Sequence, residues 1–309
     1  MKAVRFHGFG DSDVLVYEDL ERPVAGAGEV VVKVAGTSFN PVDAAVRAGI
    51  LREVLPVPLP RIPGMDMTGT IAEIGDGVTG WNVGDAVVAL LPVTGDGAAR
   101  EYVAVAAAEL AAAPRTVDLV DAAALPTVGL TAWQALFDHA GLRAGQRVLI
   151  NGAGSAVGGY AVQLAQEAGA TVVATAGPRS AERVRARGAD EVIDYTVTSA
   201  AKAVTGRFDV VLNLAFTSPE EIAELIGLVV DDGVLITTTG TDEEAGRGVR
   251  ATRMFVHGDA AQLAGLVERV DDGRLVIDVA ERSTLTGLPD VHRRADAGEL
   301  AGKTVVAVG

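Results

Sequence analysis

The part of this sequence best suited to chemistry is a run of small residues at positions 152–159, with the letters GAGSAVGG. It follows an apolar run at 147–151 and precedes a helix-like segment at 160–165. Small residues at such a turn let backbone amides approach a pyrophosphate, whose negative charge is favoured at the start of a helix. Ser155 and Ala156 stand where glycines are common, so the alternative is a tight turn without a ligand. Because strand, turn and helix follow in the required order, we predict a dinucleotide phosphate site that includes Ser155.

A second apolar run, at 171–175, ends beside residues that can discriminate between two cofactors. The letters GPRS follow at 177–180, and no Asp or Glu stands at the tip of the run. A carboxylate at this place usually binds the ribose 2′-hydroxyl of NAD, whereas an arginine suits the 2′-phosphate of NADP. Gly177, Arg179 and Ser180 therefore predict NADPH over NADH. The alternative is that Arg179 is a solvated loop charge.

These two turns lie in a region where helix-like stretches alternate with short apolar runs, as expected for βαβ units around a parallel sheet. Apolar runs cover 147–151, 171–175, 191–194, 208–214, 234–239 and 252–257, and helices are expected at 158–168, 219–229 and 259–270. Ser218, which precedes Pro219 and two glutamates, is the expected N-cap of the second helix. The runs match a dinucleotide-binding fold, in which ligands bind at the carboxyl ends of the strands. The residues expected to line that edge are Thr175, Leu214, Ala215, Thr239 and Gly240.

The flanking regions are β-like, with Gly and Pro between the runs. Such runs occur at 29–34, 68–74, 85–90 and 101–105. Residues 272–309 return to β-like sequence and end in the run 304–308, which we expect to rejoin the first domain. The predicted fold class is α/β, with a β-rich domain at 1–117, a dinucleotide-binding domain at 118–271 and a returning tail at 272–309.

Composition excludes several classes of protein. The 309 residues carry a net charge of -15, and such a chain lacks the clustered Lys and Arg that neutralise nucleic-acid phosphates. The absence of cysteine removes thiolate catalysis and thiolate-rich zinc sites. No run reaches the roughly 18 apolar residues of a membrane span, and no leader-like segment precedes the first strand-like residues, so a cytoplasmic location is expected. Four histidines have no metal-like spacing and are expected to be surface or structural residues: His7, His139, His257 and His292.

Several segments together resemble a known family. They are SFNPVD at 38–43, PGMDMTG at 63–69, VGD at 83–85, AALPTVGLTAW at 123–133, GADEVIDY at 188–195, HRR at 292–294 and GK at 302–303. Over nearly its whole length the sequence resembles the quinone oxidoreductase and zeta-crystallin branch of the medium-chain dehydrogenase/reductase superfamily. The resemblance implies a GroES-like catalytic domain joined to a Rossmann domain.

The resemblance also implies roles for individual residues. Asn40 corresponds to a residue near the nicotinamide ribose and Thr127 to one that helps to hold the nicotinamide, so these two are the predicted catalytic residues. The other implied contacts are the pyrophosphate turn at Ala156 and Val157, the 2′-phosphate pocket at Gly177, Arg179 and Ser180, and Tyr195 beside that phosphate.

The zinc-dependent relatives hold their metal with Cys and a Gly-His-Glu segment, which corresponds to PGMD at 63–66 here, so we predict no metal. Without a Lewis acid an unconjugated carbonyl is not strongly polarised, whereas hydride can add to an enone, an enoyl group or a quinone. Many relatives place a Tyr shortly after the Asn-Pro-x-Asp segment. Leu51 stands there in this sequence, so solvent or the cofactor ribose is expected to supply the proton. Asp43 and Arg47 are either substrate contacts or a structural ion pair.

The leading hypothesis is NADPH-dependent reduction of a quinone or another small conjugated carbonyl compound. One alternative is an enoyl-thioester reductase that acts on carrier-bound acyl chains, which the overall acidity mildly disfavours. Another is a non-catalytic NADPH-binding protein with a structural or sensory role. The run 252–256 is a candidate edge strand for pairing across a two-fold axis, which predicts a homodimer.

Overall fold

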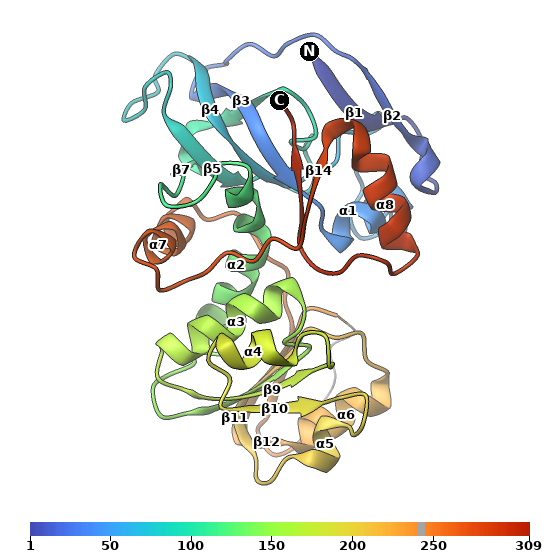
Figure 1. Ribbon diagram of the computed structural model, residues 1–309, viewed down its shortest axis with the longest axis vertical. Coiled ribbons are helices and arrows are strands. Elements are labelled where there is room, and N and C mark those ends of the chain that lie inside the picture. Colours follow the sequence, from blue (N-terminus) through green and yellow to red (C-terminus); the bar gives the residue numbers. More distant parts are fainter. Residues whose placement is uncertain (240–244) are drawn as a thin grey trace. The chain divides into compact units, whose positions relative to one another are not determined.

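The structure is a computed structural model that describes residues 1–239 and 245–309. The chain forms two compact units (Figure 1). Unit 1 comprises Met1–Thr127 and His257–Gly309, and unit 2 comprises Val128–Val256. Unit 1 is mostly β and unit 2 has a parallel sheet with helices, so the predicted α/β fold class is confirmed.

Unit 2 is built on a six-stranded sheet in the order β10-β9-β8-β11-β12-β13, in which all neighbours are parallel. With β8 to β13 numbered 1 to 6 in chain order, this is the 3-2-1-4-5-6 order of a dinucleotide-binding fold. The strands are β8 (Arg147–Asn151), β9 (Thr171–Ala176), β10 (Glu191–Asp194), β11 (Phe208–Asn213), β12 (Val229–Thr237) and β13 (Arg250–Arg253). The run predicted at 252–257 forms a strand only as far as Arg253, because β13 pairs with just four residues of β12.

Five α-helices lie wholly or partly in the described residues of unit 2. They are α2 (Pro126–Trp133), which begins in unit 1, α3 (Ala156–Glu167), α4 (Ala181–Ala186), α5 (Ala200–Ala203) and α6 (Pro219–Gly227). Figure 1 shows α3 and α4 on one side of the sheet and α5 and α6 on the other. Ile222 and Leu225 of α6 pack with Ala200 of α5 and with the sheet residues Leu149 and Val211 in one hydrophobic core. The predicted helices at 158–168 and 219–229 are therefore present, with ends that differ by two residues or fewer.

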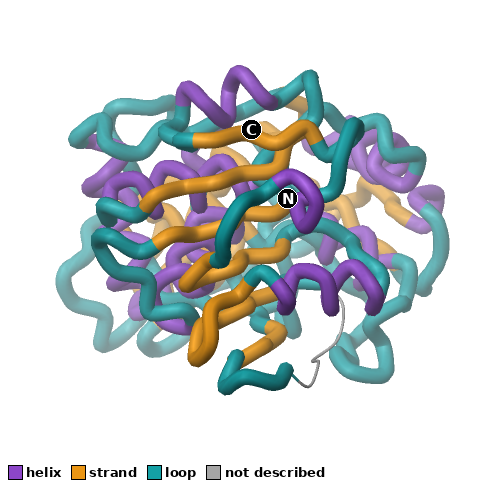
Figure 2. Tube along the Cα trace, turned by 90° about the horizontal axis from the view of Figure 1, so that it is seen from below, coloured by secondary structure: helices purple, strands orange, loops and turns teal. Residues whose placement is uncertain are grey.

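Unit 1 contains a seven-stranded sheet in the order β14-β15-β3-β4-β5-β7, with β6 paired to β3, and a separate antiparallel pair of β1 and β2. Figure 2 shows the strands of both units in orange. Their bounds are β1 (Lys2–Phe6), β2 (Leu15–Asp19), β3 (Glu29–Ser38), β4 (Asp66–Ile74), β5 (Ala86–Leu90), β6 (Tyr102–Ala106), β7 (Ala111–Ala112), β14 (Glu281–Thr284) and β15 (Thr304–Ala307). The α-helices are α1 (Pro41–Arg47), α7 (Ala260–Asp271) and α8 (Leu288–Asp296). Because β15 pairs antiparallel with β3, the tail rejoins the first unit as expected.

The boundaries between the units differ from the predicted 117/118 and 271/272. Residues 118–127 belong to unit 1, where the short 3₁₀ helix Asp121–Ala124 packs on β3, β4 and β15. Helix α7 also belongs to unit 1, because it packs on β7 and its last residue, Asp271, accepts a hydrogen bond from the backbone N–H of Arg115 at 2.7 Å. A helix-like period does not reveal which sheet the helix covers, so the sequence placed α7 with the wrong unit. Within the described ranges, no helix has both the length and the apolarity needed to cross a bilayer.

Candidate cofactor and active site

Three neighbouring strand ends in unit 1 bring polar residues together. The register pairs Gly36 of β3 with Thr68 of β4, and Ser38 of β3 with Val305 of β15. If each register is extended by two residues, Asp66 lies beside Ser38, and Lys303 lies beside Asn40. Polar side chains far apart in the sequence therefore meet where β3 ends and where β4 and β15 begin.

Asp66 lies at the centre of this cluster and has no solvent exposure. Its Oδ2 accepts hydrogen bonds from Asn40 Nδ2 at 2.8 Å and from Lys303 Nζ at 3.2 Å. The hydroxyl of Ser38 donates to the same oxygen. Its Oδ1 accepts a hydrogen bond from the backbone N–H of Thr127 at 2.6 Å. One carboxylate therefore holds both predicted catalytic residues, Asn40 and Thr127.

The carboxamide of Asn40 is held at both ends. Its nitrogen donates to Asp66 and lies 3.4 Å from Thr127 Oγ1, while its oxygen accepts a hydrogen bond from Lys303 Nζ at 2.6 Å. The structure thus brings Asn40 and Thr127 within contact of each other in one unit. Their assignment to the nicotinamide stays a prediction.

Asp43 and Arg47 do not pair with each other. Asp43 caps the start of α1, where its carboxylate accepts the backbone N–H groups of Asn40 at 2.9 Å and of Gly64 at 3.0 Å. Burial raises the pKa of Asp43 to about 6, although these two N–H donors act in the opposite direction. Arg47 forms a bidentate ion pair with Asp296 of α8, with N···O distances of 2.7 to 2.9 Å. The structural ion pair considered for Arg47 exists, but its partner comes from the C-terminal part of the chain.

His292 of α8 is a buried structural residue, in agreement with the prediction. It is 1% exposed and packs edge-on against the ring of Phe39, with ring centroids 4.9 Å apart. Burial, together with the positive charge of Arg47, lowers the pKa of His292 to about 3. Neither ring nitrogen has a hydrogen-bond partner among the residues that the structure describes.

The turn between β8 and α3 in unit 2 requires its glycines. Gly152 has a φ of +89°, and a Cβ atom at Gly158 would lie 2.5 Å from the backbone of Ala153. Ser155 is the N-cap of α3, and its side chain accepts the N–H of Gly158 at 3.1 Å. The first amides of α3, at positions 156 and 157, have no acceptor within their own helix, and the start of the helix carries partial positive charge. This is the geometry that a pyrophosphate group needs, so the residues fit a dinucleotide.

Polar side chains at the carboxyl ends of four strands form a hydrogen-bonded belt that sequence reasoning recognised only in part. Thr175 Oγ1 of β9 donates to Asn151 Oδ1 of β8 at 2.8 Å and accepts the N–H of Gly152 at 2.9 Å. Asn151 Nδ2 donates to Asn213 Oδ1 of β11 at 2.8 Å, and Asn213 Nδ2 donates to Thr237 Oγ1 of β12 at 3.2 Å. The belt attaches the glycine-rich turn to the sheet. A polar residue at the end of each apolar run was the signal that could have revealed Asn151, Asn213 and Thr237.

The same belt fixes the loops that follow β11 and β12. Thr239 Oγ1 donates to the carbonyl of Ala215 at 2.5 Å, and Asn213 Nδ2 donates to that carbonyl at 3.2 Å. The N–H of Leu214 donates to the carbonyl of Asn151 at 2.9 Å. Leu214, Ala215 and Thr239 therefore lie at the carboxyl edge of the sheet as predicted, whereas Gly240 lies outside the described residues.

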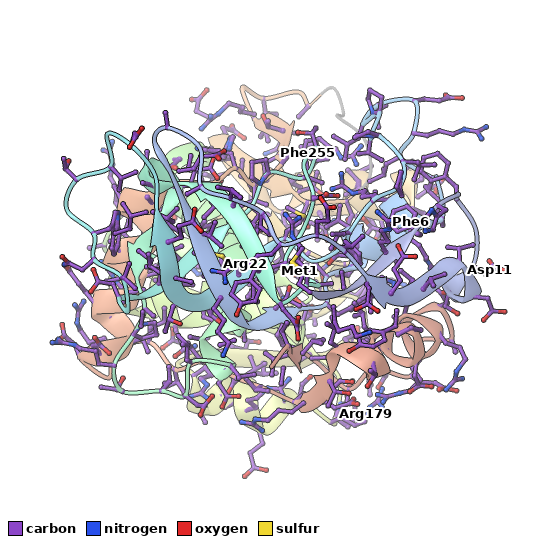
Figure 3. All side chains as sticks on the ribbon, turned by 90° about the horizontal axis from the view of Figure 1, so that it is seen from above. Met1, Phe6, Asp11, Arg22, Arg179 and Phe255 are labelled. Carbon is purple, nitrogen blue, oxygen red and sulfur yellow. The ribbon has the colours of Figure 1, made fainter. Side chains whose placement is uncertain are left out.

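The residues predicted to bind the 2′-phosphate gather after β9. The N–H of Ser180 donates to the carbonyl of Gly177 at 3.0 Å, and a side chain at Gly177 would lie 3.2 Å from the phenol oxygen of Tyr195. A Cβ atom at Gly154 would lie 2.4 Å from Ser180 Oγ, so this group adjoins the glycine-rich turn. Arg179, which directly precedes Ser180, is exposed at the surface (Figure 3).

Arg183 of α4 is a further cation at this place that sequence reasoning missed. Its Nη2 donates to the carbonyl of Gly154 at 3.2 Å, which holds the guanidinium against the glycine-rich turn. The signal was its position four residues after Arg179, one helical turn further on.

The strand order of unit 2 and its glycine-rich turn are typical of dinucleotide-binding domains. The comparisons with known proteins identify the class as oxidoreductases that use a nicotinamide cofactor. The family model of the alcohol dehydrogenase GroES-like domain matches residues 26–115, and that of the zinc-binding dehydrogenase matches residues 187–306. The chain is 34% identical to a chloroplast envelope quinone oxidoreductase homolog of Arabidopsis thaliana, over 99% of this chain and 98% of that protein. It is 31% identical to the mitochondrial NAD(P)H oxidoreductase RTN4IP1 of Mus musculus, over 97% of this chain and 87% of that protein.

A solved structure gives the same result. The quinone oxidoreductase from Coxiella burnetii superposes with a TM-score of 0.91 at 29% identity, covering 100% of this chain and 99% of that chain. This chain therefore belongs to the quinone oxidoreductase branch of the medium-chain dehydrogenase/reductase superfamily.

The name of the second family model raises the question of whether unit 1 is built to hold zinc. The sequence has no cysteine, and Met65 and Asp66 occupy the place of the His-Glu pair of the zinc-dependent relatives. The carboxylate of Asp66 is already bonded to the ammonium of Lys303 and to Asn40. Within the described ranges, no three His, Cys, Asp or Glu side chains gather as a metal site would require. These residues do not fit a zinc ion.

Proposed function

We propose that this protein is an NADPH-dependent reductase that delivers hydride to a quinone or an α,β-unsaturated carbonyl compound without a metal ion. The observation that carries the proposal is the end of β9. There Ser180 and Arg183 adjoin the glycine-rich turn, Arg179 directly precedes Ser180, and no Asp or Glu occurs from 176 to 181. Two guanidinium groups favour a 2′-phosphate over a 2′-hydroxyl, because arginine forms charge-assisted hydrogen bonds with phosphate oxygens.

The residues of unit 1 support catalysis by positioning. A bound nicotinamide supplies the hydride. Asp66 holds Asn40 and the backbone of Thr127 in fixed orientations, so neither must reorganise when a ligand arrives. The donor set of unit 1 does not fit zinc, which favours conjugated acceptors, since their negative charge spreads to oxygen without a Lewis acid.

Among residues 1–239 and 245–309, no side chain is an obvious donor of the proton that completes the reduction. Leu51, at the position where many relatives have tyrosine, is partly buried against the apolar core of unit 1. We infer that solvent or a hydroxyl of the cofactor ribose protonates the reduced acceptor.

The test is an anaerobic assay of NADPH oxidation with a panel of quinones, enones and enoyl thioesters, with NADH and EDTA as controls. Turnover of quinones or enones that prefers NADPH and resists EDTA is expected. Turnover of enoyl thioesters alone would favour a carrier-linked acyl reductase instead. NADPH binding without turnover on any acceptor would contradict a catalytic role, and a preference for NADH would contradict the cofactor assignment.

A further inference from the structure

We infer that Lys303 is a positioning residue for the reduction, which orients the carboxamide of Asn40 and acts together with Asp66 as a neutral buried pair. Lys303 belongs to one of the segments that carry the family resemblance, but the resemblance implies no role for it. The inference rests on the proposed function, because it assigns to Asn40 a place beside the nicotinamide.

The ammonium group of Lys303 is completely enclosed by acceptors. Its side chain is 3% exposed, and that of Asp66 is not exposed at all. Nζ donates to Asn40 Oδ1 at 2.6 Å, to Asp66 Oδ2 at 3.2 Å and to the carbonyl of Phe39 at 3.3 Å. An ammonium has three N–H donors, and here each has an acceptor. The group is therefore fixed in direction and cannot turn toward solvent.

This arrangement selects one of the two orientations of the Asn40 carboxamide. The oxygen and nitrogen of an amide have nearly the same shape, so only the neighbouring groups decide which faces which. Lys303 can only donate, and the carboxylate of Asp66 can only accept. The oxygen of Asn40 must therefore face Lys303, and its nitrogen must face Asp66, as observed. A reversed amide would oppose two acceptors on one side and two donors on the other.

The ion pair of Lys303 and Asp66 contributes more to the orientation of the Asn40 carboxamide than to the stability of the fold. A buried ion pair must overcome the desolvation of both charges, and apolar or neutral replacements of similar volume often cost no stability. Removal of a single partner, in contrast, leaves an uncompensated buried charge and is strongly destabilising. Single and double variants can therefore separate positioning from folding.

Strand pairing places this C-terminal lysine beside Asn40. Lys303 stands immediately before β15, and the antiparallel pairing of β15 with β3 places it beside Asn40, 263 residues away in the sequence. The C-terminal segment thus completes the candidate site within unit 1.

The experiment compares Lys303→Met, the neutral double variant Lys303→Met/Asp66→Asn, and the wild type. Thermal unfolding is measured together with kcat and KM for NADPH and for a quinone or enone that the wild type reduces. We expect Lys303→Met to lose both stability and activity. The double variant should recover most of the melting temperature and still show kcat roughly ten- to a hundredfold below wild type, the scale of a misplaced catalytic group. Lys33→Met, on the exposed side of β3, is the matched control and should change neither quantity.

Chemical rescue tests whether the ammonium itself is required, because it restores the positive charge at position 303 without the lysine side chain. Because the natural chain has no cysteine, a Lys303→Cys variant can be alkylated in urea with 2-bromoethylamine at that position alone and then refolded. The product carries an ammonium at almost the length of lysine. We expect kcat to return to within about threefold of a wild-type sample taken through the same treatment.

Wild-type kcat in the neutral double variant would overturn the inference, because the pair would then be structural only. A rescue that restores the melting temperature without restoring kcat would overturn it as well. Failure of the wild type to oxidise NADPH with any acceptor would instead refute the proposed function, and the inference with it.

Discussion

At the scale of single residues, two buried ionisable groups of unit 1 have displaced pKa values with opposite effects on stability. Burial raises the pKa of Asp43 from 3.8 to about 6, so the folded chain binds this proton more readily than the unfolded chain. The stabilising contribution is complete below pH 3.8 and is lost as the pH rises through 6. Burial lowers the pKa of His292 from 6.5 to about 3, so the unfolded chain binds that proton more readily. The contribution of His292 is present above pH 6.5 and is lost as the pH falls toward 3.

Substitution of each residue should remove its own contribution to the pH dependence of stability. In His292→Leu, the unfolding free energy relative to wild type should rise by roughly 3 kcal/mol between pH 7.5 and pH 4.5, because two pH units below 6.5 are worth about 1.4 kcal/mol each. In Asp43→Asn, the same difference should change in the opposite direction, since wild type gains the stabilising proton on acidification. Urea unfolding at the two pH values measures both. Differences that do not vary with pH would contradict these assignments.

At the scale of elements, the beginnings of helices show how local signals become structure. Ser218 caps α6 as predicted: its hydroxyl accepts the N–H of Glu221 at 3.3 Å, while the carboxylate of Glu221 accepts the N–H of Ser218 at 2.8 Å. Ser199 is the N-cap residue of α5 but makes no such bond with its side chain. Replacement of Ser218 by Ala should therefore lower the free energy of unfolding by about 1 kcal/mol, whereas Ser199→Ala should cost much less. Equal losses in denaturant titrations of the two variants would show that the capping bonds do not contribute.

At the scale of the whole molecule, cofactor selectivity can be measured through stability. A ligand that binds only the folded chain stabilises it, by about 2.7 kcal/mol at a hundredfold excess over its Kd. NADPH should therefore raise the melting temperature more than an equal concentration of NADH. Arg183→Gln should reduce this difference, because it removes a cation held against the glycine-rich turn. The control is Arg185→Gln, an exposed arginine of the same helix. An unchanged difference in Arg183→Gln, with NADPH still preferred, would exclude Arg183 from phosphate recognition.

Features that arise from neighbouring residues could be predicted from the sequence. The alternation of apolar runs and helices, the glycine-rich turn at 152–159 and the cap at Ser218 depend on backbone conformations and contacts a few residues apart, and each is present in the structure. The α/β class, the six parallel strands and the return of the tail followed from such patterns.

Only the tertiary structure decided which distant side chains meet. Asn40, Asp66 and Lys303 form one cluster because the registers of β3, β4 and β15 align three strand ends, and register between distant strands leaves no local trace in the sequence. The same reason applies to the Asn151 and Asn213 belt across parallel strands, and to the packing of α7 on unit 1. Local propensity determined the elements, and long-range packing determined which of their polar residues became a site.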